Sequence, residues 1–312
     1  MADGRFAPSP TARLHLGNLR TAMLAWLSAR SSGSRFLLRI EDLDQIACRR
    51  EHEIAALDDL HELGLDPDGP VVRQSERSEI YRLAIDRLVA EDLTYPCYCT
   101  RREVLAEATA SIAAPHGARA TGAYPGTCST LDRAGRAERE ASGRTPSLRL
   151  RGEGAVVSFV DGLVGFSQGS VDDFVIRRAD GTPAYNLTVV VDDAAQGVGE
   201  VVRGDDLLET TPRQIYLARL LDLAVPEYLH VPLVFGPDGE RLAKRHGAVT
   251  LSDQLLKGRT AQDVRADFAF SLGLAEPDEG PSLAQLVERF DPRLVPREVW
   301  VLPHGIAGSV ES

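Results

Sequence analysis

The sequence RFAPSPTARLHLGN, residues 5–18, decides the expected fold. Its first three residues are typical of a short strand, which the two following prolines end. Apolar residues then recur at helical spacing over 18–30, and residues 36–40 (FLLRI) are typical of a second strand. The order strand, loop, helix, strand predicts a parallel sheet of the α/β class. Ligands of such sheets bind beyond the carboxyl ends of the strands, where the loop over 8–17 would lie.

Further elements of both kinds are expected along the chain. The segments predicted to be helical are 51–63, 76–91 and 209–223, with short helical stretches after residue 247. The segments predicted to be strands are 155–160, 173–177, 188–191 and 231–235. The run TVVV at 188–191 is apolar enough to predict a buried central strand. A Gly/Ser tail is expected to be disordered.

Charge and hydropathy argue against two classes of protein. The 312 residues include 35 Lys and Arg against 46 Asp and Glu, a formal net charge of −11. This charge disfavours a sequence-independent nucleic-acid coat and a polybasic membrane binder, although a local basic face could still dock RNA. No run reaches the roughly 18 apolar residues of a membrane span, and the first ten residues lack a signal-peptide core. We therefore expect a soluble, cytoplasmic protein without a membrane partner.

Three of the four cysteines lie close together in the sequence, at Cys97, Cys99 and Cys128. In a reducing compartment this grouping indicates a metal site before a disulfide, whereas Cys48 reads as an ordinary thiol. The Cys-x-Cys spacing is tighter than the usual zinc pattern. It leaves two alternatives, a structural zinc site or three reduced and buried thiols. General ligand chemistry favours His116 as the fourth ligand of such a zinc.

A change of surface accompanies the cysteines. Residues 101–151 contain nine arginines and five acids, hence a local charge of +4 in a chain of −11. This contrast predicts an insert with its own surface. We therefore expect four parts: the first half of an α/β domain (1–95), a basic insert (96–180), the second half of the domain (181–240), and a loop with a helical region (241–312).

Two segments suit the binding of a polyphosphate. His15 and Gly17 stand at the expected helix N-terminus, whose free N–H groups and dipole attract phosphate oxygens. Read alone, this short pattern is more often a surface turn. The segment ERLAKRHG at 240–247 follows a Pro-Asp-Gly turn and could bring ammonium and guanidinium charge onto a reacting phosphate. Read alone, it would be a solvated basic turn.

Seven motifs, in order, resemble those of the class I glutamyl-tRNA synthetases. They are RFAPSPT at 5–11, HLGN at 15–18, RIED at 39–42, AYNL at 184–187, VVVDD at 189–193, VRGDD at 202–206 and RLAKR at 241–245. Their order over about 240 residues makes the resemblance far more specific than any single motif. It implies a Rossmann-type parallel sheet as the catalytic domain, a zinc-containing insert and a short helical C-terminal region that contacts an RNA stem.

The resemblance also implies a reaction and a set of site residues. Glutamate attacks the α-phosphate of ATP, which enters with magnesium; pyrophosphate leaves, and the glutamyl-adenylate then acylates RNA. The implied catalytic set is His15, Gly17, Asn18 and Lys244, of which His15 and Lys244 bind ATP. The implied glutamate site consists of Arg5, Phe6, Ala7, Pro8, Ser9, Glu41, Tyr185 and Arg203. Arginines suit the carboxylates of the substrate, and Glu41 suits its ammonium group. Read alone, Arg5, Glu41 and Tyr185 would be a surface residue, a helix cap and core packing.

The sequence departs from the family pattern at four positions. Ala12 stands where glycine is usual, which would cost roughly 1 kcal/mol if the backbone there had positive φ. Asn18 replaces a histidine and keeps a donor without the charge. Arg241 replaces a lysine and Ala243 replaces a serine. None of these changes removes the histidine, glycine or second lysine of the two signatures, so activity is expected to persist.

Two features favour the glutamyl-queuosine tRNA(Asp) synthetases within the family. Their zinc pattern is Cys-x-Cys followed by Tyr-x₃-Cys, so the resemblance implies Tyr124, with His116 as the alternative, as the fourth ligand of one structural zinc beside Cys97, Cys99 and Cys128. Only 62 residues follow Thr250, too few for the anticodon-binding region of a full glutamyl-tRNA synthetase.

The implied RNA partner is the anticodon stem-loop of tRNA(Asp), with glutamate joined to queuosine at the wobble position. Two alternatives remain. One is a short glutamyl-tRNA synthetase that charges a tRNA 3′ end, and the other is a catalytically silent paralogue that only binds RNA.

Overall fold

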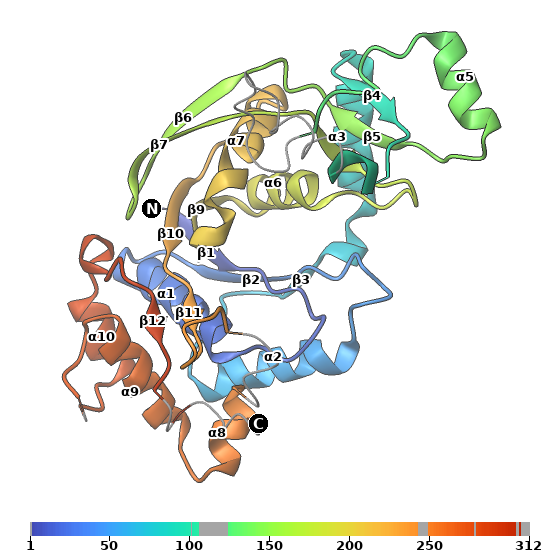
Figure 1. Ribbon diagram of the computed structural model, residues 1–312. Helices are drawn as coiled ribbons and strands as arrows, with labels where there is room; N and C mark the ends of the chain where they lie inside the picture. Colours follow the sequence, from blue (N-terminus) through green and yellow to red (C-terminus); the bar gives the residue numbers. More distant parts are fainter. Residues whose placement is uncertain are drawn as a thin grey trace.

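A seven-stranded sheet organises the computed structural model, which describes residues 2–100, 102–105, 124–242, 249–277, 279–303 and 306 (Figure 1). In order across the sheet, the strands are β3 (Val72–Arg73), β2 (Phe36–Ile40), β1 (Asp3–Phe6), β9 (Val198–Gly204), β10 (Glu227–Val231), β6 (Val156–Asp161) and β7 (Gly165–Ser170). Every neighbouring pair is parallel except β6 and β7, which form an antiparallel hairpin. The expected α/β class with a parallel sheet is therefore confirmed.

Helices cover both faces of this sheet (Figure 1). Successive strand side chains point to opposite faces, so Val201 of β9 joins one buried cluster and Val202 joins the other. The cluster around Val202 contains residues of α1 (Leu16–Ser31), α2 (Arg50–Glu62), α8 (Leu251–Leu256), α9 (Ala261–Ser271) and α10 (Leu283–Arg289). The cluster around Val201 contains residues of α3 (Ser78–Ala90), α6 (Tyr185–Gln196) and α7 (Thr211–Leu220). The central strands are thus buried on both faces, as parallel strands usually are.

A second, antiparallel sheet of three strands lies beside the first. Its order is β4 (Thr94–Cys97), β5 (Ser147–Leu150) and β8 (Phe174–Arg177). The helix α5 (Arg133–Ala141), which buries no residue, stands at the edge of the molecule (Figure 1). Between β5 and β8 the chain leaves this sheet and supplies β6 and β7 to the main sheet. The range 96–180 therefore contributes to both sheets, and the four-part domain division stays a prediction.

Short elements complete the described residues. The 3₁₀ helices are Gln74–Glu76, Asp205–Thr210 and Pro292–Leu294. The strands β11 (Val234–Phe235) and β12 (Trp300–Val301) pair in parallel and join the C-terminal region to the body of the protein. None of the described helices has the length and apolar character needed to cross a membrane.

The prediction of a central strand at 188–191 is wrong, because these residues belong to helix α6. The helix ends at Gly197, whose φ of 70° is the left-handed conformation that glycine adopts readily. Its last turns carry Asp192 and Asp193, both buried against polar partners. Asp192 accepts hydrogen bonds from Gln74, Arg77 and Tyr81. Tertiary contacts therefore outweigh the weak strand preference of a β-branched run.

The other elements follow the sequence more closely. The helices expected over 18–30, 51–63, 76–91 and 209–223 correspond to α1, α2, α3 and α7, and the strands expected at 36–40, 155–160 and 173–177 correspond to β2, β6 and β8. The strand predicted at 231–235 is wrong in its bounds, because Pro232 separates β10 from β11. Strand β9, at the centre of the sheet, was not predicted. The tail expected to be disordered lies almost entirely outside the described residues.

Candidate active site

A cavity of about 450 Å³ opens at the carboxyl ends of β1, β2 and β9, beside the start of α1. It collects the residues that the sequence motifs single out. Its lining includes Arg5, Phe6, Ala7, Pro8, Ser9, His15, Gly17, Asn18, Glu41, Tyr185 and Arg203. Lys244, the remaining residue of the expected catalytic set, lies outside the described residues. Every described member of the expected catalytic and glutamate-binding sets therefore faces one cavity, at the edge of a parallel sheet where ligands bind.

His15 caps the N-terminus of α1. Its Nδ1 accepts a hydrogen bond from the backbone N–H of Asn18 at 3.2 Å, and Oδ1 of Asn18 accepts from the backbone N–H of His15 at 3.2 Å. Burial, with a smaller contribution from Arg241, lowers the pKa of His15 to about 4. The imidazole is therefore neutral at pH 7, with its hydrogen on Nε2. It offers the cavity an N–H donor without a charge.

Gly17 is required by close packing around this histidine. A Cβ at position 17 would lie 3.0 Å from the His15 ring and 3.2 Å from Cβ of Val234. Ala12 shows no comparable strain. The non-glycine residues with positive φ in the described part of the chain are Asp92, Glu153 and Asp222, so an alanine fits the loop without the cost considered for position 12.

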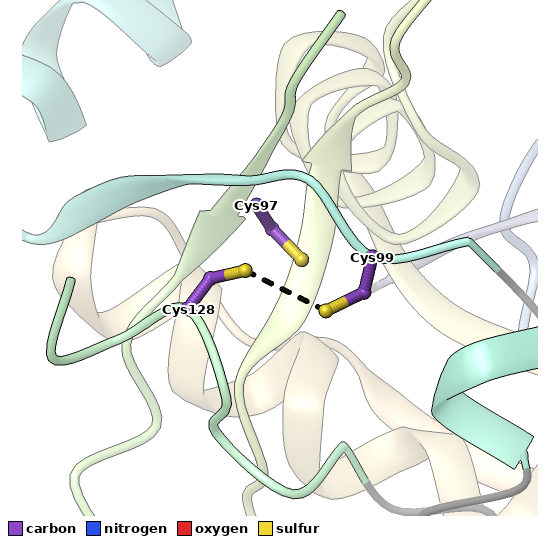
Figure 2. A group of neighbouring side chains, drawn as sticks. All are labelled: Cys97, Cys99 and Cys128. Carbon is purple, nitrogen blue, oxygen red and sulfur yellow. Dashed lines mark hydrogen bonds between the residues drawn. The ribbon is translucent and has the colours of Figure 1, made fainter. Parts of the chain in front are cut away.

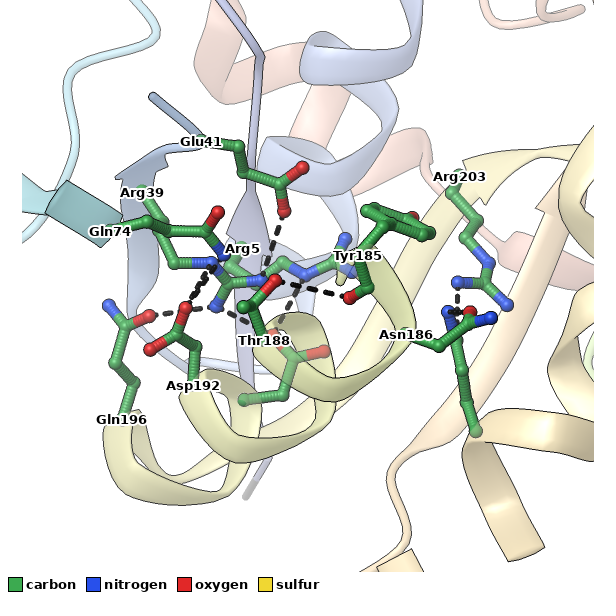
Figure 3. A network of polar contacts seen from close by, with 12 residues as sticks. Arg5, Arg39, Glu41, Gln74, Tyr185, Asn186, Thr188, Asp192, Gln196 and Arg203 are labelled. Carbon is green, nitrogen blue, oxygen red and sulfur yellow. Dashed lines mark hydrogen bonds and ion pairs between the residues drawn. The ribbon is translucent and has the colours of Figure 1, made fainter. Parts of the chain in front are cut away.

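A buried ionic network holds Arg5 and Glu41 (Figure 3). Asp193 of α6 accepts hydrogen bonds from Nε of Arg5 at 3.3 Å and from Nη1 of Arg39 at 2.7 Å. The other Nη of Arg39 lies 3.6 Å from the carboxylate of Glu41. Burial raises the pKa of Glu41, although Arg39 and Arg5 oppose that shift. The carboxylate of Glu41 is thus positioned to bind a cation, since an ammonium group in the cavity would add to its charge partners.

Arg203 stands across the cavity from this network, on β9 (Figure 3). Its guanidinium donates to Nε2 of His230 at 3.0 Å, to Oε1 of Gln214 at 2.7 Å and to Oγ1 of Thr211 at 2.8 Å. These partners are neutral groups, so they orient the guanidinium without neutralising its charge. A carboxylate that enters the cavity can therefore still form a charge-assisted pair with Arg203.

The three thiols of Cys97, Cys99 and Cys128 converge as the sequence predicts (Figure 2), with all three sulfur atoms within 4.8 Å of one another. Sγ of Cys99 lies 3.5 Å from Sγ of Cys128. The hydroxyl of Tyr124 lies 3.3 Å from Sγ of Cys97 and 3.6 Å from Sγ of Cys99. A tetrahedral zinc with bonds of about 2.3 Å to sulfur places its ligand atoms about 3.8 Å apart, so the four groups fit such an ion. His116 lies outside the described residues.

A larger cavity, of about 1100 Å³, connects the two regions. It shares Ser9, Glu41 and Tyr185 with the smaller cavity and extends to Cys99 and Tyr124. The two cavities are therefore contiguous. A substrate in the smaller one can be reached by a second, bulkier group from the side of the thiol cluster.

Sequence reasoning did not find the residues behind the cavity. Asp193 lies in a quoted motif without an assigned role, and the partners of Arg203 were not predicted. A histidine inside the apolar strand sequence EYLHV was the available signal for His230. Its significance depends on the register that places it beside Arg203, which the sequence alone does not give.

Comparison with known proteins agrees with this geometry. The sequence model of the family described as "tRNA synthetases class I (E and Q), catalytic domain" matches residues 2–269. A glutamyl-Q tRNA(Asp) synthetase of Nocardia farcinica is 58% identical, over 96% of this chain and 92% of that protein. One of Symbiobacterium thermophilum is 48% identical, over 97% and 96% of the two chains.

A relative with a different name and one solved structure extend the comparison. A glutamate–tRNA ligase of Oleidesulfovibrio alaskensis is 43% identical, but this chain, with 92% of its length aligned, spans only 60% of that protein. The crystal structure of the glutamate–tRNA synthetase of Elizabethkingia anophelis, 24% identical, superposes with a TM-score of 0.82 over 98% of this chain and 68% of that one, which shows the same fold. The chain therefore belongs to the class I tRNA synthetases (E and Q), is a ligase, and groups with the glutamyl-Q tRNA(Asp) synthetases.

Proposed function

We propose that this protein activates L-glutamate with ATP and transfers the glutamyl group to queuosine at the wobble position of tRNA(Asp). The relatives named glutamyl-Q tRNA(Asp) synthetase support the RNA substrate. The observation that carries the proposal is one cavity that holds two buried arginines, the carboxylate of Glu41 on a buried side chain and the capped N-terminus of α1. An amino acid with two carboxylates and an ammonium group complements this set of charges.

In the first step, a carboxylate oxygen of glutamate attacks the α-phosphorus of ATP. The bond between the α-phosphorus and the bridging oxygen breaks, and pyrophosphate leaves with the electron pair of that bond. The product is glutamyl-adenylate. No side chain becomes covalently attached, so the protein contributes by positioning two anions and stabilising the charge that develops on the phosphate.

The residues divide this work between them. Arg5 and Arg203 bind the carboxylates of glutamate and Glu41 binds its ammonium group, while Tyr185 adds a hydroxyl. Residues 6–9 form the wall beside them. At the start of α1, Gly17 and Asn18 keep the loop close to the nucleotide. His15 donates from Nε2 to a phosphate oxygen, and Lys244 supplies the positive charge that the neutral histidine does not.

The second step joins glutamate to the RNA. A hydroxyl of queuosine attacks the acyl carbon of the adenylate, AMP leaves, and the hydroxyl proton leaves with it or passes to solvent. The larger cavity supports this placement, because it is contiguous with the glutamate site and has the volume for a nucleoside. The partner we propose is the anticodon stem-loop of tRNA(Asp), and the cytoplasm is the location in which that substrate is available.

We also propose one structural zinc ion bound by Cys97, Cys99, Cys128 and Tyr124. The convergence of the three sulfur atoms and the distances to the Tyr124 hydroxyl support this ligand set. When bound, a zinc with four protein ligands is closed to substrate and contributes folding energy. Its role here is to fix the segment that carries α5 against β4.

A specific observation favours a second candidate, a synthetase that charges the 3′ end of a tRNA. Glutamate–tRNA ligases also match most of this chain, at 41–43% identity. The chemistry would be the same, on a different RNA atom. A silent RNA-binding paralogue is disfavoured because the two arginines, Glu41 and His15 all face the cavity.

One experiment separates these functions. The purified protein is incubated with labelled glutamate, ATP and tRNA(Asp), either with queuosine or with unmodified guanosine at the wobble position. We expect label only on the queuosine-containing tRNA, retained after removal of the 3′ nucleotide. Label removed together with the 3′ nucleotide would establish the short glutamyl-tRNA synthetase, and absence of both label and adenylate formation would establish the silent paralogue.

A further inference from the structure

A buried histidine and aspartate lie directly behind Arg203, outside the cavity itself. His230 on β10 is the register partner of Arg203 on β9, so their side chains start side by side on neighbouring parallel strands. Nδ1 of His230 lies 2.6 Å from Oδ2 of Asp161, which is at the end of β6. His230 and Asp161 are fully buried, and Arg203 is 5% exposed.

The chemistry of the three groups fixes where the hydrogens are. A guanidinium has donors only, so its Nε–H can bond to Nε2 of His230 only if that nitrogen presents its lone pair. The hydrogen of the ring must then be on Nδ1, from which it is donated to Asp161. The hydroxyl of Thr211, 3.1 Å from Nε2, accepts from Arg203 and is compatible with the same arrangement.

The aspartate is itself held in place. Its Oδ1 accepts hydrogen bonds from the backbone N–H groups of Leu163 and Val164 at 3.0 and 2.9 Å. Burial would raise the pKa of Asp161, but the hydrogen bonds from His230 and these two amides outweigh it and leave the pKa lowered. Burial also lowers the pKa of His230, although the hydrogen bond with Asp161 opposes this shift. The lowered pKa favours the neutral form of the ring. The arrangement is therefore an ionised carboxylate, a neutral imidazole and a charged guanidinium, in line.

We propose that Asp161 and His230 are positioning residues for substrate binding: they fix one tautomer of the imidazole, whose lone pair holds the guanidinium of Arg203 in the orientation that receives a carboxylate of glutamate. This inference rests on the proposed function, because it takes glutamate as the ligand of Arg203. Neither residue touches the substrate. Their effect is on the KM for glutamate, because without this acceptor the Nε–H of Arg203 is left unpaired and, among the described residues, only Gln214 and Thr211 still orient the guanidinium.

Two substitutions of His230 form a matched pair that tests whether its Nε2 holds Arg203. The amide of asparagine reaches the position of Nδ1, so His230→Asn keeps a donor for Asp161 and removes the acceptor for Arg203. The amide of glutamine reaches the position of Nε2, so His230→Gln restores that acceptor. In glutamate-dependent ATP–pyrophosphate exchange, we expect His230→Asn to raise the KM for glutamate roughly ten-fold or more, the usual effect of leaving a buried charged donor unpaired.

The same assay contains its controls. We expect the KM for ATP in both variants to stay within about two-fold of the wild-type value, and the KM for glutamate of His230→Gln to return to within about three-fold. Equal KM values for glutamate in the two variants would overturn the proposal, as would a loss confined to kcat. The rise in melting temperature on adding glutamate reports the same binding in a variant that is catalytically slow.

A second measurement does not depend on activity or on a folded variant. In wild-type protein labelled with ¹⁵N at histidine, the His230 signals should show a protonated Nδ1 and an unprotonated Nε2 at pH 7. A hydrogen on Nε2 would overturn the proposal, because that nitrogen could then not accept from Arg203. A wild-type protein without glutamate-dependent exchange would refute the proposed function instead, and the tautomer would still decide whether His230 can hold Arg203.

Discussion

The smaller cavity, which contains Arg5, Glu41 and Arg203, and the thiol cluster hold their functional groups by different means. In the cavity, Arg5 and Arg203 come from distant parts of the sequence, and buried side chains such as Asp193 and His230 fix each guanidinium. In the thiol cluster, the sulfur atoms come from one short stretch and have mainly each other and Tyr124 as partners. The first site is thus preorganised by the protein's own hydrogen bonds, whereas the second would be completed by the zinc ion that we propose.

The largest effect is expected from Lys244→Ala, which removes the positive charge that the proposed function assigns to the reacting phosphate. Exchange of pyrophosphate into ATP, with glutamate and without RNA, should fall by roughly 100- to 1000-fold, corresponding to about 2–4 kcal/mol of transition-state stabilisation. The melting temperature should be nearly unchanged. Lys257→Ala is the matched control, because Nζ of Lys257 donates to the backbone carbonyl of Ile306 and does not line the cavity.

The requirement for RNA is the sharpest part of this test. The proposed function predicts that wild-type protein activates glutamate without tRNA. Exchange that begins only when tRNA is added would contradict that prediction and would favour the short glutamyl-tRNA synthetase.

The second prediction concerns a variant that disrupts the thiol cluster and leaves the smaller cavity intact. Protein purified without chelator should contain one zinc per chain, and Cys97→Ser should contain less than about a tenth of that amount. Transfer of glutamate to tRNA should fall roughly ten-fold, while exchange without RNA stays within about three-fold. Cys48→Ser is the control, since this half-buried thiol lies outside the cluster. Elemental analysis that finds no zinc in the wild type would refute the metal site.

The fourth ligand can be decided with two further variants. Tyr124→Phe should weaken zinc binding, measured by competition with a chelator, and His116→Ala should not. The opposite result would assign the imidazole of His116, which general ligand chemistry favours, in place of the Tyr124 phenol.

The difference between the two regions also explains what the sequence could predict. The motifs located the cavity because strands, loops and helix starts place short sequences such as HLGN at one edge of a parallel sheet. The thiols were found because they are close in sequence. The residues that hold Arg203 were missed because their role depends on the pairing of His230 with Arg203, a long-range register that local patterns do not contain.

Two elements were missed for physical reasons that are visible in the structure. The run at 188–191 has the composition of a strand, yet it forms α6 because Asp192 and Asp193 bury their charges against arginines of other elements. Strand β9 has the sequence VGEVVRG, in which two glycines and two charged residues obscure the apolar pattern. Its arginine is tolerated because the main sheet places Arg203 at the cavity.

A third, smaller effect concerns the pH dependence of the cavity. The pKa of His15 is about 4 in the folded protein, lowered by burial, against 6.5 as its ordinary value. Between pH 6.5 and 4 the unfolded chain therefore binds more protons at this residue, so the free energy of unfolding falls as the pH is lowered. His15→Asn keeps a cap for α1 and should reduce the slope by up to roughly 1 kcal/mol per pH unit within that window. Urea titrations at several pH values measure it, and an unchanged slope would show that His15 does not titrate there.

The smallest expected effect lies on α5, which follows Cys128 in the sequence. Its residues are solvent-accessible, and Nε of Arg136 donates to the backbone carbonyl of Leu131. The nearby Glu140 accepts a hydrogen bond from Tyr98, and no ion pair joins Glu140 to an arginine of α5 in the part of the chain that the structure describes. The arginines of this helix are therefore available to RNA phosphates. Pairing with Glu138 and Glu140 is the competing interpretation, worth only tenths of a kcal/mol for each pair.

Replacing Arg133 and Arg136 together with glutamine decides between these roles. If both arginines bind phosphates, the slope of log K against log salt for tRNA(Asp) binding should flatten by roughly one unit per arginine, because fewer counterions are released. Glutamate activation without RNA should be unchanged, since α5 contributes nothing to the cavity. Arg293→Gln probes the alternative, because its guanidinium pairs with Asp291 in the C-terminal region, on the opposite side of the molecule from α5 (Figure 1). An unchanged slope in the double variant, with a reduced slope in Arg293→Gln, would move the RNA contacts from the insert to the residues after Thr250.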